Sequence, residues 1–111
     1  MYDTTTTLKR GITEILALSL LQEGEQYGYR FVRLIRERSA GKISLTEGAI
    51  YTTMYRLEEQ KFVKSEEVLI NAKRRRKYYS LTETGKKYAK QEIEKYNNLA
   101  SGVRSIIDFT V

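Results

Sequence analysis

The stretch Lys73-Arg74-Arg75-Arg76-Lys77-Tyr78-Tyr79-Ser80-Leu81-Thr82 decides the fold of this 111-residue chain. Five consecutive cations lead into a segment rich in tyrosine and leucine, a composition typical of a β-strand. A second strand-like segment, residues 63–70, precedes them, and Asn71 favours a turn in the residues between the two. The sequence therefore predicts a β-hairpin over residues 62–81 with a positively charged tip.

Most of the net charge of the chain lies in this hairpin. The whole sequence has 20 Lys and Arg against 14 Asp and Glu, a formal net charge of +6. Residues 62–81 have six cations against two carboxylates, whereas residues 1–61 have nine against eight and residues 82–111 have five against four. A run of cations alone is equally consistent with a solvated loop. Its concentration in one hairpin favours a polyanionic partner.

The composition also excludes several classes of protein. The sequence contains no Cys and no His, which removes disulfides, common zinc sites and most general bases. We therefore predict neither an enzyme nor a bound metal or cofactor. The longest apolar run, residues 15–21, is too short to span a bilayer, and residues 1–7 lack the apolar segment of a signal peptide. These features predict a cytoplasmic protein.

Three helical segments are expected before the hairpin, after a polar tail at residues 1–8. Leucine and isoleucine recur at helical spacing over residues 11–23, and a second apolar stripe follows over residues 26–39. Gly24 and Gly41 are suitable C-terminal stops for these two helices. The tetrapeptide Ser44-Leu45-Thr46-Glu47 matches a capping box with Ser44 as N-cap, so a third helix is expected to run to about residue 60.

The third helix has an outward face that differs from an ordinary solvated surface. Ile50, Met54 and Leu57 recur on its inner side at helical spacing. The opposite side has small, hydroxyl and aromatic groups with a single cation, a combination that suits insertion into a groove. These outward residues are Gly48, Thr52, Tyr55 and Arg56, flanked by Tyr51.

The last helix is expected over residues 83–108, with a second capping box at residues 80–83 and Thr82 as a competing N-cap. At 1.5 Å per residue it would be about 40 Å long, too long for its own core to cover. We therefore expect a partner helix, by default in a symmetric homodimer. Gly85, in its first turn, is expected to permit close contact with another helix. The apolar stripe of the helix consists of Ala89, Ile93, Tyr96, Ala100, Val103 and Ile107, widened by Leu99 and Ile106.

The order helix, helix, helix, hairpin, long helix predicts a mainly α (α+β) fold, a winged helix-turn-helix DNA-binding domain with a long C-terminal dimerisation helix. Residues 1–81 would form the winged helix-turn-helix, with the wing at about 62–81. Residues 82–111 would form the dimerisation helix, which is not an independent domain. In such a fold the third helix enters the major groove and the wing touches the adjacent backbone.

Several segments in this order resemble the PadR family of bacterial transcriptional regulators, over about residues 8–107. They are residues 15–21 (Ile-Leu-Ala-Leu-Ser-Leu-Leu), Tyr27-Gly28-Tyr29, Glu47-Gly48-Ala49-Ile50-Tyr51, Arg56-Leu57-Glu58, and residues 74–85 from Arg74 to Gly85. The single long C-terminal helix resembles the small-PadR subgroup. The resemblance implies a homodimeric winged-helix repressor, which would bind a pseudo-palindromic operator.

The resemblance also implies a small hydrophobic or planar effector, since in some members a flat ligand sits at the dimer centre against a tryptophan of the last helix. Judged by its distance from Gly85, Tyr96 looks like the equivalent position here. A candidate effector pocket would therefore be lined by Tyr96, Leu99, Ala100 and Val103.

The predicted DNA-binding residues lie on the third helix and in the wing. Arg56 could bond a guanine edge or a phosphate, or else pair with Glu59 or Glu25 at the surface. Gly48 would let DNA approach the backbone, or else pack closely against the second helix. The full set is Gly48, Tyr51, Thr52, Tyr55 and Arg56 on the helix, and Lys73, Arg74, Arg75, Arg76 and Lys77 in the wing.

Two further points stay open at the level of sequence. Tyr51 could donate to a phosphate or pack beneath the wing, and Tyr27 and Tyr29 are expected in the core or in an interface. An alternative function is a winged-helix protein-interaction module that uses its long C-terminal helix to bind another protein.

Overall fold

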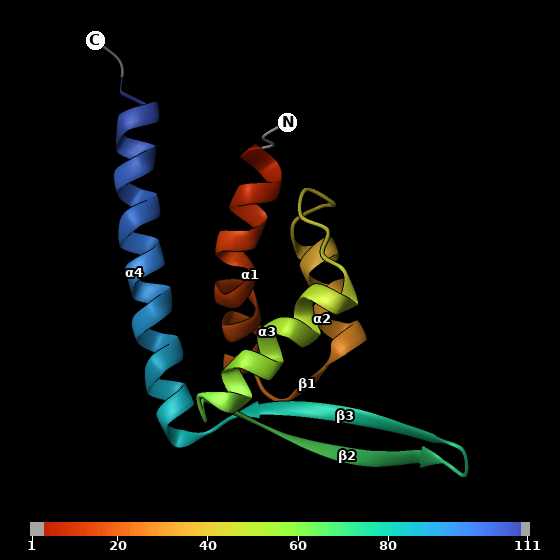
Figure 1. The fold of residues 1–111 in the computed structure, drawn as a ribbon. Helices are drawn as coiled ribbons and strands as arrows, with labels where there is room; N and C mark the ends of the chain where they lie inside the picture. The colour runs from red at the N-terminus through yellow and green to blue at the C-terminus, as the bar shows by residue number, and fades with distance from the viewer. Residues whose placement is uncertain (1–3, 110–111) are drawn as a thin grey trace.

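The computed structural model describes residues 4–109 and has the predicted mainly α winged-helix architecture. Figure 1 shows helices α1 to α3 grouped together, a hairpin that projects from one end of the group, and a long helix that stands beside α1. The elements in chain order are α1 (Thr4–Gln22), β1 (Gln26–Tyr27), α2 (Gly28–Arg38), α3 (Glu47–Glu59), β2 (Val63–Asn71), β3 (Arg74–Leu81) and α4 (Glu83–Ile107).

Two predicted element boundaries were wrong. Helix α1 begins at Thr4, so residues 4–8 of the expected tail are helical, while residues 1–3 lie outside the described range. No proline interrupts this segment, and a helix that is anchored by its apolar face propagates one residue at a time. Gln26 and Tyr27 form the short strand β1 instead of a helical turn, because they pair with Tyr79 and Tyr78 of β3.

The N-caps of α3 and α4 are equivalent threonines. The Thr46 Oγ1 accepts the Ala49 N–H at 3.1 Å, and the Thr82 Oγ1 accepts the Gly85 N–H at 3.0 Å. The prediction of Ser44 as the cap of α3 was therefore wrong by two residues, and the competing prediction of Thr82 is confirmed. Each threonine is followed by a glutamate, whose negative charge interacts favourably with the positive N-terminal end of the helix dipole.

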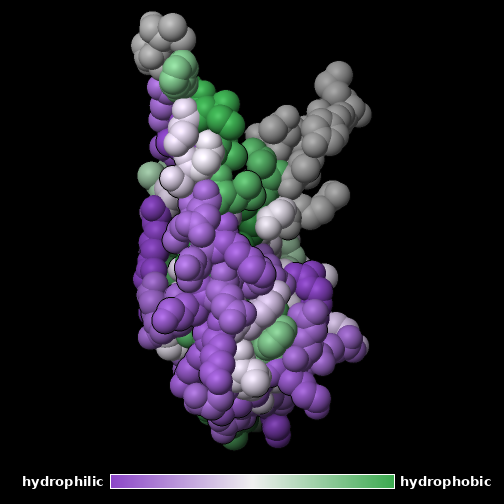
Figure 2. Space-filling view, turned by 90° about the vertical axis from the view of Figure 1, so that its left-hand side faces the viewer, coloured by the Kyte–Doolittle hydropathy of each residue, from purple (hydrophilic) through white to green (hydrophobic). Residues whose placement is uncertain are grey.

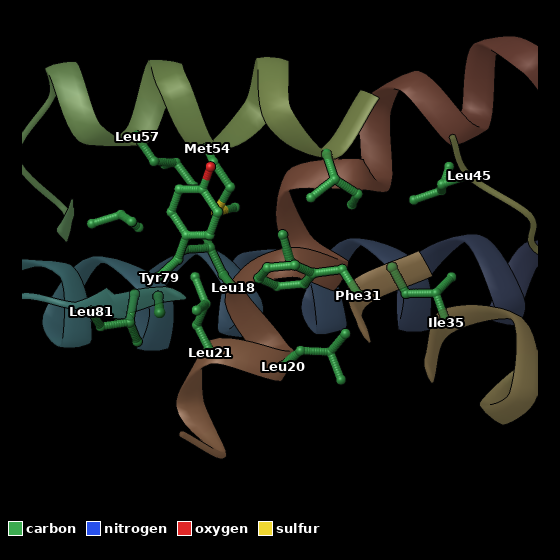
Figure 3. Close-up of a cluster of buried hydrophobic side chains, with 14 of the residues drawn as sticks. Leu18, Leu20, Leu21, Phe31, Ile35, Leu45, Met54, Leu57, Tyr79 and Leu81 are labelled. Carbon is green, nitrogen blue, oxygen red and sulfur yellow. The ribbon is translucent and has the colours of Figure 1, made fainter. Parts of the chain in front are cut away.

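The three strands form an antiparallel sheet in the order β1-β3-β2, with β3 in the centre. Ser65 pairs with Tyr79 and Glu67 with Lys77, so the side chains of these four residues share one face of the hairpin. Tyr79 is buried on this face, and Figure 3 shows its ring extending toward α3. The cations of β3 consequently alternate between the face toward α3 and the opposite face.

The core lies where α1, α2, α3 and β3 meet. The predicted inner stripe of α3 is confirmed, since Ile50, Met54 and Leu57 have no exposed surface. Figure 3 shows Met54, Leu57 and Tyr79 packed above leucines of α1, with the Phe31 ring beside them. Helix α3 is thereby fixed through one side, and its other side remains open for binding.

The end of α3 is joined to the start of α4 by backbone contacts. Helix α3 ends with Lys61 in the left-handed region (φ 65°), and the Phe62 N–H returns to the Leu57 carbonyl at 3.0 Å. The Phe62 carbonyl accepts the Thr82 N–H at 3.0 Å, and the Lys61 carbonyl accepts the Thr82 hydroxyl at 2.7 Å. A Cβ added to Gly85 would lie 1.8 Å from the Phe62 carbonyl oxygen. Gly85 thus permits contact with this turn, not with another helix as predicted.

The first part of α4 packs against the protomer's own core. Ala89 is fully buried, Ile93 is partly buried against the same cluster, and Tyr88 stacks on Phe62 with ring centroids 4.0 Å apart. The prediction that Ala89 belongs to a dimer interface was therefore wrong, because its own chain covers it completely. Only the part of α4 beyond Ile93 offers an apolar surface to a partner.

We expect Gly85→Ala to lower the free energy of unfolding by more than about 2 kcal/mol, because the new methyl group overlaps a backbone carbonyl that cannot rotate away. Gly102→Ala is the matched control in the same helix, since nothing lies within 4 Å of its added Cβ. The control should raise the free energy of unfolding by up to about 1 kcal/mol through helix propensity. Urea unfolding of both variants measures this, and equal effects would contradict the account of Gly85.

Candidate nucleic-acid interface

A groove of about 820 Å³ lies between α3 and the hairpin and collects most of the predicted binding residues. Its wall on α3 includes Tyr51, Thr52 and Tyr55, and the start of α2 closes it at one end. The hairpin provides a positively charged wall opposite α3. The cations among the lining residues are Arg74, Arg75, Arg76 and Lys77.

The wall on α3 presents phenol hydroxyls in their neutral form. Tyr51 is 44% exposed and its hydroxyl lies 3.5 Å from a carboxylate oxygen of Glu47; burial, followed by that carboxylate, raises the pKa of Tyr51. Tyr55 is 66% exposed, and its hydrogen bond to Glu59 raises the pKa of its phenol. Both tyrosines therefore keep the hydroxyl proton near neutral pH, and each hydroxyl is hydrogen-bonded to a glutamate of the same helix.

Close packing between α2 and α3 depends on Gly28, not on Gly48. A Cβ on Gly28 would lie 2.6 Å from the Tyr51 hydroxyl oxygen, so the Tyr51 ring packs on the start of α2. A Cβ on Gly48 would meet only the Thr46 hydroxyl, at 3.8 Å. Gly48 is exposed one turn before Thr52, so the space in front of the first turn of α3 is open to a ligand.

The hairpin cations fall into two groups. Lys77 lies 3.6 Å from the Glu58 carboxylate, and the Arg76 guanidinium stands 4.0 Å from the ring centroid of Tyr27 on the other face. Both side chains are therefore held by other residues at the middle of the hairpin. The tip cations Lys73, Arg74 and Arg75 are exposed, and the ion pair of Arg75 with Glu67 is long, at 3.8 Å, and open to solvent. Such an exposed pair stabilises little and is readily exchanged for another anion.

Arg56, which was predicted to bind DNA, is not among the residues that line this groove. Its Nη2 lies 2.9 Å from the Oε1 of Glu14 in α1, and the Tyr88 hydroxyl of α4 donates to the other oxygen of Glu14 at 3.0 Å. Arg56 also pairs with Glu14 in place of the alternative that the sequence suggested, a surface ion pair with Glu59 or Glu25. Through Glu14, Arg56 thus links α3 to α1 and α4.

Sequence reasoning assigned no binding role to seven of the residues that line the groove, which are Tyr27, Gly28, Tyr29, Glu47, Glu58, Glu67 and Tyr79. Tyr29 is 55% exposed in the first turn of α2, where an interior or interface position was expected. The carboxylates of Glu58 and Glu67 also lie among the groove residues. The hairpin register, which places Glu67 opposite Lys77, would have identified Glu67, but the register is known only from the structure.

A second surface, on the C-terminal half of α4, is apolar. Leu99 is 69% exposed and Ile106 is 79% exposed, while Ala100 is partly covered. Figure 2 looks at the molecule from the α4 side and shows hydrophobic surface over its upper part, above a hydrophilic lower part. The exposed apolar residues of this surface are Tyr96, Leu99, Val103, Ile106, Ile107 and Phe109.

The described residues offer neither a metal site nor a helix that could cross a membrane. Over residues 4–109 there is no cluster of three or more acidic side chains that could hold a metal ion. In the same range no helix combines the length and the apolar character needed to cross a membrane.

The sequence and the fold are both similar to those of known transcriptional regulators. The model of the "Transcriptional regulator PadR-like family" matches residues 17–91. A transcriptional regulator from Clostridium thermocellum has a similar structure, with a TM-score of 0.80 and 29% identity over 97% of this chain and 100% of that one. A PadR family regulator from Eggerthella lenta is 28% identical, with a TM-score of 0.78 over 95% and 89% of the two chains. Bacillus subtilis PadR, solved in complex with operator DNA, is 26% identical, with a TM-score of 0.65 over 77% of this chain and 46% of that one.

The buried tyrosines predict a loss of stability at high pH. Burial raises the pKa of Tyr79 to about 12, and burial together with the bond to Glu14 raises the pKa of Tyr88 to about 12. An unfolded tyrosine ionises near pH 10. The stability that these groups contribute is therefore complete below about pH 10 and is lost as the pH rises from there toward about 12.

Urea unfolding at a series of pH values above 9 tests this, with Tyr88→Phe as the comparison. The variant should lose less of its free energy of unfolding over the pH interval than the wild type, because one of the two phenols is gone. Parallel pH profiles for the two proteins would contradict the role of Tyr88.

Proposed function

The chain belongs to the transcriptional regulator PadR-like family, whose model covers more than half of its length, and we propose that it is a homodimeric repressor that binds a pseudo-palindromic operator. The single observation that carries DNA binding is the groove between α3 and the hairpin, with hydroxyl and aromatic groups on one wall and cations on the other. The family and the similar structures are transcriptional regulators, not enzymes.

Sequence reading is assigned to the exposed stripe of α3. In this proposal Thr52 and Tyr55 enter the major groove, where a threonine can contact a thymine methyl group or hydrogen-bond a base edge. Gly48 at the start of the helix permits close approach of the DNA backbone. Arg56 is given no part in base reading, since its guanidinium is paired with Glu14.

Phosphate binding is assigned to the hairpin tip. Lys73, Arg74 and Arg75 are the exposed cations there, and the positive charge of the chain is concentrated in this segment. Each phosphate contact releases counterions and makes the affinity fall with salt. The similarity to Bacillus subtilis PadR, which was solved with operator DNA, supports DNA binding by this chain.

The apolar surface of α4 is assigned to a second copy of the chain. Its exposed residues Tyr96, Leu99, Val103 and Ile106 recur at spacings of three and four, the pattern of a helix that packs along another helix. A two-fold dimer through α4 would present two α3 helices to DNA, about one turn or ~34 Å apart, or a multiple of it.

A small hydrophobic or planar effector is also part of the proposal. Tyr96, Leu99 and Val103 are exposed and Ala100 is partly covered, so a second α4 could close a pocket over them. Tyrosine offers a ring for stacking but also a hydroxyl that needs a partner. Binding of a planar cationic compound would be detected as a shift in thermal unfolding that Tyr96→Ala removes.

Substitution of the tip cations should weaken all DNA binding alike. We expect Arg74→Ala and Arg75→Ala each to reduce the slope of log affinity against log salt by about one, with similar losses for operator and unrelated duplexes. Arg33→Ala is the matched control, because Arg33 is an exposed arginine of α2 outside the groove. Fluorescence anisotropy at several salt concentrations measures the slopes; a changed operator preference would show that the tip reads sequence.

A charge in the α4 stripe should separate the dimer. Val103→Glu is expected to give a monomer at micromolar concentration, since burying a carboxylate in an apolar interface is unfavourable. Ser101→Glu introduces the same charge on another side of the exposed helix and should leave the dimer intact. Analytical ultracentrifugation distinguishes the two, and a wild-type monomer that associates only with a different protein would favour the interaction-module alternative.

A further inference from the structure

Glu58 is an unexpected residue to find in a groove that is proposed to bind a polyanion. It lies near the end of α3, seven residues after Tyr51 and three after Tyr55, so it continues the stripe of α3 that faces the hairpin. Its side chain is 29% exposed, the lowest value among the four side chains that form the two ion pairs of the hairpin. A carboxylate here repels phosphate unless something else compensates its charge.

The carboxylate of Glu58 contacts both strands of the hairpin. One oxygen, Oε2, accepts the Ser65 hydroxyl of β2 at 2.8 Å. The other, Oε1, lies 3.6 Å from the Lys77 ammonium of β3. Ser65 and Lys77 share the face of the hairpin that looks toward α3, and the Lys77 ammonium also stands 5.6 Å from the Tyr79 ring centroid. One side chain of α3 thus holds each strand of the hairpin by a different interaction.

This position gives Glu58 control over the angle of the hairpin. From Lys77 to the tip at Lys73 the strand extends about 13 Å, at roughly 3.3 Å per residue. A tilt of about 10° at the Glu58 contacts would therefore move the tip by about 2 Å, more than a hydrogen bond tolerates. A hairpin at a different angle could still contact phosphates. It could not do so at the same time as α3 contacts the base edges in the major groove.

We propose that Glu58 is a positioning residue, which fixes the hairpin relative to α3 so that base reading and phosphate binding occur together. The inference rests on the proposed function. Loss of the Glu58 contacts should reduce the preference for operator over unrelated DNA, whereas loss of a mere repelling charge should strengthen binding to both. These opposite outcomes separate positioning from simple electrostatics.

Glu67 provides a matched control for the charge. It lies on the same face of the hairpin, and its ion pair with Arg75 joins β2 to β3 without touching α3. Glu67→Gln removes the same unit of charge from the groove as Glu58→Gln but leaves the link to α3 in place. Ser65→Ala is the second test variant, because it removes the other contact of Glu58 without changing the charge.

The binding test uses a duplex that the wild-type protein selects from a random-sequence library and an unselected duplex of equal length. For Glu58→Gln and Ser65→Ala we expect the ratio of the two affinities to fall by about tenfold, with affinity for the unselected duplex unchanged or higher. For Glu67→Gln both affinities should rise alike and the ratio should stay constant. Equal behaviour of Glu58→Gln and Glu67→Gln would overturn the proposal.

A second measurement needs no DNA, so it separates this inference from the proposed function. The sequence has no cysteine, so spin labels can be placed on Ala72→Cys in the hairpin turn and Lys42→Cys before α3. The labelled protein is diluted with unlabelled protein to suppress distances between copies. The distance distribution should broaden in Glu58→Gln and Ser65→Ala and stay unchanged in Glu67→Gln; unchanged distributions in all three would overturn the positioning role even if DNA binding failed altogether.

Discussion

The contact between the Phe62 carbonyl and the first turn of α4 is the constraint on which the other parts of the molecule depend. Helix α3 ends, the hairpin begins and α4 begins within a few ångströms of this carbonyl, which accepts the Thr82 N–H at 3.0 Å and leaves room for no side chain at Gly85. The stacking of Phe62 on Tyr88 extends the contact one turn along α4. Because backbone atoms make the contact, the direction of α4 is fixed relative to α3, and a dimer formed through α4 would fix the separation of two α3 helices.

Helix α3 is further held on both sides by charged side chains, which leaves only one stripe for binding. On one side Arg56 pairs with Glu14, which also accepts the Tyr88 hydroxyl. On the other side Glu58 bonds Ser65 and lies close to Lys77. In the proposed complex, base reading would therefore come from uncharged groups and the long-range attraction from the hairpin tip. The affinity for DNA would then depend on the salt concentration, and the preference for one DNA sequence would depend on the position of α3 relative to the hairpin.

Local signals in the sequence were sufficient for the element order and for most of the groove. Apolar periodicity located the inner face of α3, and Asn71, which accepts the Lys73 N–H at 3.0 Å, located the hairpin turn. Contacts between distant residues were not predictable in this way. Glu14 and Arg56 are 42 residues apart, and the two-residue strand β1 exists only because β3 lies beside it. Ala89 matched the apolar stripe of α4 but packs inward, since periodicity does not say which surface covers a residue.

In the proposed complex, α3 reads sequence through Thr52 and Tyr55, whereas Arg56 has a structural role. Selection of duplexes from a random-sequence library by the wild type, Thr52→Ala and Arg56→Met tests it most directly. We expect the wild type to enrich two symmetry-related half-sites, Thr52→Ala to relax the preference at one position in each half-site, and Arg56→Met to keep the wild-type preference. An absence of any enriched sequence, or a preference that changes in Arg56→Met but not in Thr52→Ala, would contradict it.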